Sequence, residues 1–170
     1  MKNFLILILL ITGFLNAQIQ VGSTTLDERE VVDGLDVPWE IKWGPDSGVD
    51  EDFLWVTERS GLVSRINVAT GEKHVILDIE SSVWDSNEAG LLGMEIHPDF
   101  NNGAPYVFLV YTYLSGGAKE KIVYYEYDSD ADQLINEVVL LDGLDGATKI
   151  ASNTCMTHIR EKVFDLLVNK

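Results

Sequence analysis

Residues 84–100 read WDSNEAGLLGMEIHPDF, and this stretch contains the pattern on which the whole chain is built. An acidic polar loop, residues 85–88, leads into a short apolar segment, residues 90–96, which ends at a His-Pro-Asp turn. Loops that are placed by a rigid sheet carry binding and catalytic groups more often than core segments do. The stretch therefore predicts a strand over 90–96, with a candidate functional loop in front of it.

The same pattern occurs earlier in the chain. Pro45-Asp46 closes one strand and Pro98-Asp99 closes another, 53 residues later, and Val56-Thr57 is echoed by Tyr111-Thr112. Apolar segments of strand length alternate with turn residues, and no segment before residue 149 has a helical period. The expected strands are Glu30–Val32, Trp39–Trp43, Phe53–Glu58, Leu62–Val68 and His74–Ile79, then Gly90–Ile96, Tyr106–Tyr113, Lys121–Asp128 and Glu137–Leu141.

This repeat predicts an all-β fold, and specifically a β-propeller. Four short antiparallel strands that recur at about 50 residues are typical of propeller blades. A β-sandwich is the competing interpretation, but it gives no reason for the unit to repeat. The chain offers two blades, whereas a propeller needs at least about four to close its ring. We therefore expect either an incomplete ring or partners, such as an oligomer, that cover the exposed blade faces.

The first residues predict export. One Lys is followed by an apolar run and then by small residues that end at Ala17, which is the pattern of a secretory signal peptide over residues 1–17. The run is too short to span a bilayer, and no second one follows. We expect a periplasmic or extracellular protein whose two blades occupy residues 18–148.

The charge of the chain excludes some partners and marks a break in composition. Residues 18–148 contain 7 Lys and Arg against 26 Asp and Glu, whereas residues 149–170 contain 4 against 2. The acidic body argues against nucleic acid and anionic membrane as partners. The single Cys155 cannot form an internal disulfide, so the core alone must stabilise the fold.

The histidines do not form an obvious site. In the His-Pro-Asp turn, Pro98 fixes φ and Asp99 is expected to bind local backbone amides, so we assign His97 a structural role. His74 and His158 have no visible partner, and no trio of metal ligands can be assembled.

Three other polar patterns have structural explanations. Residues 128–133, DSDADQ, imitate a calcium loop but lack its glycine and its final glutamate, so we expect an acidic hairpin turn. Glu58-Arg59 at a strand end predicts an ion pair or a backbone contact. Tyr125 and Tyr127 share one strand face, where packing between blades explains them.

Several segments together resemble the amino-terminal part of the soluble quinoprotein glucose/sorbosone, or aldose sugar, dehydrogenases. They are GLDVPWEIKWGPD (34–46), FLWVTERSGLVSRIN (53–67), EAGLLGMEIHPDF (88–100), YVFLVYTY (106–113), and KIVYYEY followed by VVLLDGLDG (121–127 and 138–146). The resemblance implies a six-bladed β-propeller that holds pyrroloquinoline quinone with the aid of Ca²⁺. It also implies oxidation of the C1 hydroxyl of aldoses to lactones, with electrons passed to an external acceptor.

Few residues of this chain match the family's catalytic and cofactor-binding residues. Glu88 matches a family Gln or Glu near the quinone. The catalytic His belongs to a His-Asn-Gly motif, and if Asn153 is the motif Asn, then Ser152 stands where the base is expected, so no catalytic residue is assigned. Ser cannot act as a base near neutral pH. No metal ligand is assigned either, and we expect this chain not to bind the quinone or Ca²⁺.

Residues 149–170 form a divergent tail in which the charge changes sign and the strand pattern ends. A frameshift or a truncated gene model explains these features, and a genuine short protein with a capping segment is the alternative. Our first hypothesis is an inactive amino-terminal fragment of an exported sugar dehydrogenase. The second is a non-enzymatic propeller module that binds protein or glycan and completes itself by oligomerisation, since the same domain serves as a binding module in Hedgehog-interacting proteins.

Overall fold

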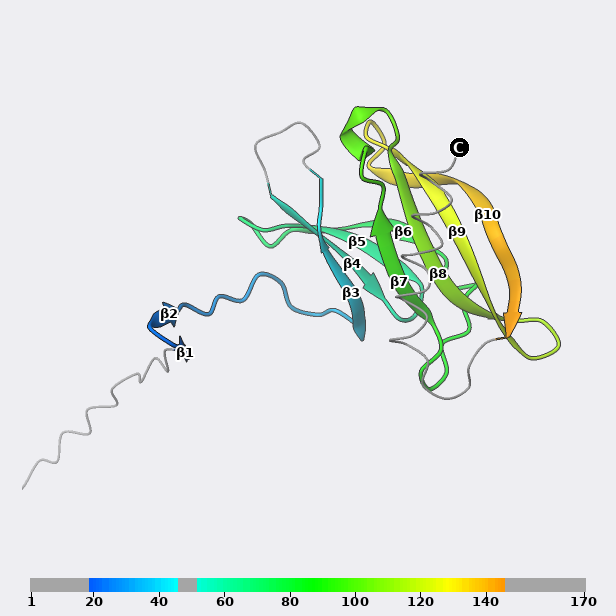
Figure 1. Ribbon diagram of the computed structural model, residues 1–170, viewed down its shortest axis with the longest axis horizontal. Helices are drawn as coiled ribbons and strands as arrows, with labels where there is room; N and C mark the ends of the chain where they lie inside the picture. Colours follow the sequence, from blue (N-terminus) through cyan, green and yellow to red (C-terminus); the bar gives the residue numbers. More distant parts are fainter. Residues whose placement is uncertain (1–18, 46–51, 146–170) are drawn as a thin grey trace, which may run out of the picture. The chain divides into compact units, whose positions relative to one another are not determined.

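The computed structural model describes residues 19–45 and 52–145 (Figure 1). The expected signal peptide, residues 1–17, and the divergent tail, residues 149–170, lie outside the described residues. The chain divides into two compact units, residues 1–30 and 31–170. Among the described residues, no helix is both long and apolar enough to cross a bilayer.

The first unit contains a small hairpin. Strands β1 (Ile19–Val21) and β2 (Thr24–Leu26) pair antiparallel. Gly22 in the connecting turn has φ 63°, a conformation that glycine adopts without steric cost. The sequence analysis predicted no strand here, although a two-residue Gly-Ser connection is itself a hairpin signal.

The second unit contains two four-stranded antiparallel sheets, which confirms the all-β prediction. The strands of the first sheet follow chain order: β3 (Pro38–Trp43), β4 (Phe53–Glu58), β5 (Leu62–Asn67) and β6 (Lys73–Asp78). The second sheet does the same with β7 (Leu91–Ile96), β8 (Tyr106–Leu114), β9 (Ala118–Asp128) and β10 (Gln133–Asp145). A short 3-10 turn, η1 (Phe100–Asn102), follows β7. Each sheet is one repeat unit of the sequence.

One predicted strand is wrong. Residues 30–32 are not a strand, although Val31 and Val32 are half-buried. A strand exists only where its backbone groups pair with a neighbour, and none of the described ladders includes these residues. Their apolar character reflects partial burial and not sheet formation.

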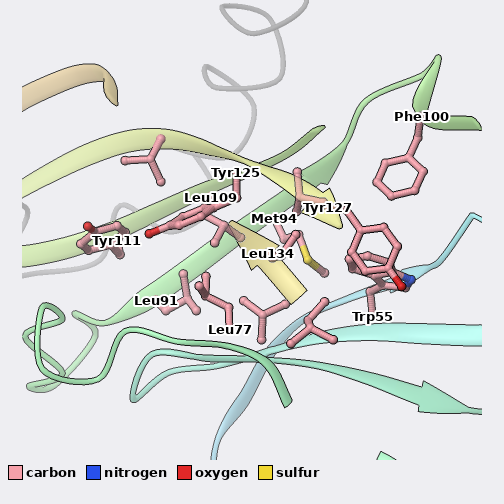
Figure 2. Close-up of a cluster of buried hydrophobic side chains, with 14 of the residues drawn as sticks. Trp55, Leu77, Leu91, Met94, Phe100, Leu109, Tyr111, Tyr125, Tyr127 and Leu134 are labelled. Atoms are coloured by element: carbon pink, nitrogen blue, oxygen red, sulfur yellow. The ribbon is translucent and has the colours of Figure 1, made fainter. Parts of the chain in front are cut away.

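The main hydrophobic core lies between the two sheets (Figure 2). Trp55, which is only 1% exposed, stands edge-on to Tyr127 with ring centroids 5.2 Å apart and to Phe100 at 5.9 Å. β7 packs on β3 and β4, and β6 packs on β10. Face-to-face packing of successive four-stranded sheets is the arrangement of propeller blades. Tyr125 and Tyr127 both lie in this core, as predicted.

The opposite face of the second sheet carries its own apolar cluster, made of Phe108, Val110 and Ile122 with Tyr106, Tyr124 and Leu140 packed on them. Tyr124 is thus on the other side from its neighbour Tyr125, as the alternation of a strand requires. The second sheet is therefore apolar on both faces, which a blade with two neighbours needs.

An ionic cluster also joins the two sheets. Asp132, in the β9–β10 turn, accepts a hydrogen bond from Tyr127 at 2.6 Å and pairs with Arg65 of β5 at 3.2 Å and with His74 of β6. Burial acts to raise the pKa of Asp132, but the hydrogen bonds from Tyr127 and His74 and the charge of Arg65 outweigh it and lower that pKa. The cluster thus holds an ionised carboxylate at the sheet–sheet boundary.

Candidate functional site

The loop from Ile79 to Gly90 connects the outer strand β6 to the inner strand β7 and carries Glu88. Its backbone is tied down at several points. The amide of Trp84 donates to the carbonyl of Thr112 at 2.8 Å, and the amide of Ala89 donates to Ser86 at 3.0 Å. A loop fixed in this way holds its side chains in defined positions, as a binding site requires.

Arg59 is the main contact of this loop with the first sheet. Its guanidinium Nη1 donates to the carbonyl of Asn87 at 2.9 Å, and its own carbonyl accepts from the amide of Leu91 at 2.9 Å. Gly90 has φ 148°, and a Cβ there would lie 2.4 Å from Cγ of Arg59. Only glycine therefore fits at position 90.

Glu88 itself is exposed. Within residues 19–45 and 52–145, its carboxylate has no hydrogen bond or ion pair with another side chain. A carboxylate held by a rigid backbone and left free of protein partners is available to a ligand. This is the position in which the sequence analysis placed a residue near the cofactor.

Glu58 binds the segment just before β3, the inner strand of the first sheet. It is 1% exposed, and its carboxylate accepts from the backbone amide of Asp36 at 2.6 Å, from the hydroxyl of Ser64 at 3.4 Å and from Lys73. Arg59 donates its own amide to Val37 at 3.1 Å. Of the two alternatives predicted for Glu58-Arg59, the backbone contact is confirmed: Glu58 accepts from the Asp36 amide and Arg59 donates to the Asn87 carbonyl, so the two side chains contact different loops.

The consecutive residues Glu58 and Arg59 therefore contact the backbone at the starts of both inner strands, β3 and β7. Inner strands line the central channel of a propeller, so their starts form the rim of that channel. Further along these inner strands, toward their ends, Lys42 of β3 binds Glu95 of β7 at 3.1 Å and Glu40 at 3.4 Å. The candidate site is this rim, with Glu88 as its free acidic group.

His97 has the structural role that was expected of it, but by another route. Its Nδ1 accepts from the amide of Asp99 at 3.0 Å, and its ring stacks on Phe108 with centroids 6.3 Å apart. The expectation that the Asp99 side chain binds local amides is wrong, since it makes no such cap at η1. The imidazole takes that role for the Asp99 amide.

The remaining predicted residues fall into two groups. Asp128 accepts from the amides of Asp130 at 2.9 Å and Ala131 at 3.0 Å, which confirms the acidic hairpin turn. Ser152, Asn153, Cys155 and His158 lie outside the described residues. The partner of Arg59 could not be predicted, because no local signal relates a strand-end arginine to a loop 28 residues away.

Within residues 19–45 and 52–145, the side chains do not make up a quinone and calcium site. No three His, Cys, Asp or Glu side chains gather around a point within the described ranges. A tricarboxylate quinone also needs cationic partners, and Arg59 and Lys42 already bind protein oxygens. What the described residues offer is one rigidly placed carboxylate.

Comparisons with known proteins all lead to one group. A family model described as glucose/sorbosone dehydrogenase matches residues 35–162. The quinoprotein glucose dehydrogenase B of Acinetobacter calcoaceticus is 28% identical over 151 residues, which cover 84% of this chain and 30% of that protein.

Solved structures agree. A putative oxidoreductase (glucose dehydrogenase) of Thermus thermophilus superposes with a TM-score of 0.57 at 29% identity, covering 71% of this chain and 32% of that one. The soluble aldose sugar dehydrogenase of Escherichia coli gives 0.56 at 23% identity, covering 66% and 31%. The chain spans about a third of the length of these relatives.

Proposed function

Because this chain belongs to the glucose/sorbosone dehydrogenase family, whose model matches residues 35–162, we propose that it is the amino-terminal part of an exported quinoprotein sugar dehydrogenase. The fold is that of two neighbouring β-propeller blades. The proposed reaction is oxidation of the C1 hydroxyl of an aldose to a lactone, with transfer of the electrons to an external acceptor. Residues 1–17 are proposed as the signal peptide, residues 18–148 as the two blades, and residues 149–170 as a divergent tail.

Glu88 is the observation on this chain that supports the proposal. A free carboxylate stands on a rigid loop at the start of an inner strand, where the channel of a propeller opens. We propose that Glu88 contacts the pyrroloquinoline quinone or the sugar and adds one acceptor to their binding. Ser152 occupies the place of the family's base in this proposal and supplies no base itself.

The proposal can be tested by titration with pyrroloquinoline quinone in the presence of Ca²⁺, followed by absorbance. The resemblance alone led to an expectation of no binding, but the exposed Glu88 carboxylate on its fixed loop leads us to expect weak binding by the 170-residue chain, no turnover of glucose, and a further loss of affinity in Glu88→Ala. Glu80→Ala is the matched control, because it removes an exposed carboxylate from the same loop. If Glu88→Ala and Glu80→Ala bind the quinone with equal affinity, Glu88 is not part of the site. Tight quinone binding with oxidation of glucose would show that the chain holds a complete site.

A second candidate function is favoured by apolar side chains on β3. Ile41 and Trp43 are 56% and 61% exposed and lie on one face of the strand. Exposed apolar groups of this size mark interaction surfaces. In a non-enzymatic module that binds protein or glycan and associates through this face, Ile41 and Trp43 would be exposed in the single chain and covered in the oligomer. Light scattering after size exclusion tests it, because Trp43→Ser should then lower the mass of the particle, whereas a monomer in both forms argues against it.

A further inference from the structure

We infer that Arg59 is the positioning residue of the Glu88 loop, and that its guanidinium fixes the direction in which the Glu88 carboxylate is presented. The inference rests on the proposed function, because Glu88 is the group that is positioned. Arg59 does not touch the proposed ligand in this scheme. It acts from the end of β4 on the loop that connects the two sheets.

The first observation is the bond between the Arg59 guanidinium and the loop. Nη1 of Arg59 donates to the carbonyl of Asn87 at 2.9 Å, and Asn87 is the residue directly before Glu88. Asn87 has φ 58°, a left-handed conformation that asparagine tolerates, and a contact on its peptide group would fix that conformation further. A charged donor on the Asn87 carbonyl is such a contact, and it sets the peptide plane from which Glu88 extends.

The second observation is the close packing on the other side of Glu88. Gly90 lies against the stem and the carbonyl of Arg59, where an added Cβ would be 2.4 Å from Cγ and 2.5 Å from the oxygen. The Leu91 amide then bonds to the same carbonyl at 2.9 Å. Arg59 thus holds the backbone on both sides of Glu88.

The third observation is that, within the described residues, the other hydrogen bonds of the loop do not involve the Asn87 carbonyl. The Ala89 amide bonds to Ser86 at 3.0 Å and the Gly90 carbonyl accepts from Thr112 at 3.0 Å, but these bonds leave the Asn87 carbonyl to Arg59. The backbone of Arg59 would keep its bonds in any substitution. A substitution can therefore remove the guanidinium of Arg59 and leave its backbone bonds in place. Its removal should loosen residues 86–90 without opening the sheets.

Hydrogen exchange of the 170-residue chain without quinone tests this directly. Arg59→Met keeps an unbranched stem to pack on Gly90 and removes the guanidinium, whereas Arg59→Lys keeps one cationic donor. We expect the amide of Ala89, which is hydrogen-bonded to Ser86 inside the loop, to exchange on the order of tenfold faster in Arg59→Met, because the loss of one charge-assisted hydrogen bond lets the loop open more often. Arg59→Lys should exchange at a rate closer to that of the wild type.

The buried amides of Val107 and Val123 serve as an internal reference for global opening. They should keep their wild-type rates in both variants. The inference is overturned if the Ala89 amide exchanges within about twofold of wild type in Arg59→Met, if Val107 and Val123 accelerate by the same factor, or if Lys fails to restore protection.

A double-mutant cycle on quinone affinity then links the loop to the proposed function. Arg59→Met should weaken quinone binding, but it should have no further effect when Glu88 is already Ala, because it acts through Glu88. Additive losses would overturn the positioning role. If no variant differs in quinone binding while exchange changes as expected, the proposed function fails and the placement of the loop by Arg59 stands.

Discussion

Replacing Asp132 with asparagine should destabilise the contact between the two sheets without changing its shape. The carboxylate accepts from the Tyr127 hydroxyl at 2.6 Å and pairs with Arg65 at 3.2 Å and with His74. Asn has the same size and also tolerates the φ of 50° found at this position, so the backbone cost should not change. The substitution removes a charge and little else.

The expected loss is about 2 kcal/mol of unfolding free energy. Hydrogen bonds to charged groups contribute about 1.5–3 kcal/mol each. The Asp132 side chain is 24% exposed, so solvent weakens these interactions, and the amide oxygen of Asn can still accept from Tyr127. Against this, Arg65 is only 13% exposed and is left without its counter-charge.

Urea unfolding followed by tryptophan fluorescence measures the effect, since Trp55 stands 5.2 Å from the Tyr127 ring. With a slope of about 2 kcal/mol per molar urea, the midpoint should fall by about 1 M. Asp130→Asn is the control, because Asp130 lies in the same turn and is exposed. The reasoning is refuted if Asp132→Asn stays within about 0.5 kcal/mol of wild type, or if Asp130→Asn costs as much.

Three further predictions concern the same sheets and can be checked by the same unfolding assay. Because the pKa of Asp132 is lowered from 3.8 in the folded state, its stabilising contribution is present above 3.8 and is lost as the pH falls through the folded-state pKa. The difference in unfolding free energy between wild type and Asp132→Asn should therefore shrink as the pH falls below about 5. Gly90→Ala should cost about 3 kcal/mol, since the new Cβ meets Arg59 at 2.4 Å at a φ of 148°, and a loss below about 1 kcal/mol would contradict the close packing. Glu58→Gln should also cost about 3 kcal/mol, because it leaves Lys73 without its buried partner, and an unchanged midpoint would contradict the ion pair.

Much of the fold could be predicted from local pattern. Eight of the predicted strands correspond to β3–β10, because alternating apolar side chains and turn residues act within a few neighbours along the chain. The predicted strand at residues 30–32 is wrong because strand formation there depends on a remote neighbour and not on local pattern. Whether Val31 and Val32 join a ladder depends on a neighbour that local sequence does not identify.

The site was harder to predict than the fold. The sequence placed Glu88 in a loop before a strand, and the structure places it there with an exposed carboxylate. It could not show that Arg59 supports this loop, or that Glu58 turns to Lys73 and the Asp36 amide instead of to Arg59. These contacts are made between segments that are remote in sequence, so no spacing rule reveals them.

The sequence by itself determined the strand pattern, the two repeats and the turns, because each depends on backbone preferences and side-chain alternation over a few residues. Only the tertiary structure decided which charges meet. Asp132 pairs across the sheets with Arg65 and His74, and Arg59 reaches Asn87. The physical reason is that hydrogen bonds and ion pairs act over about 3 Å, and only the packing of one sheet on the other brings these groups within that distance.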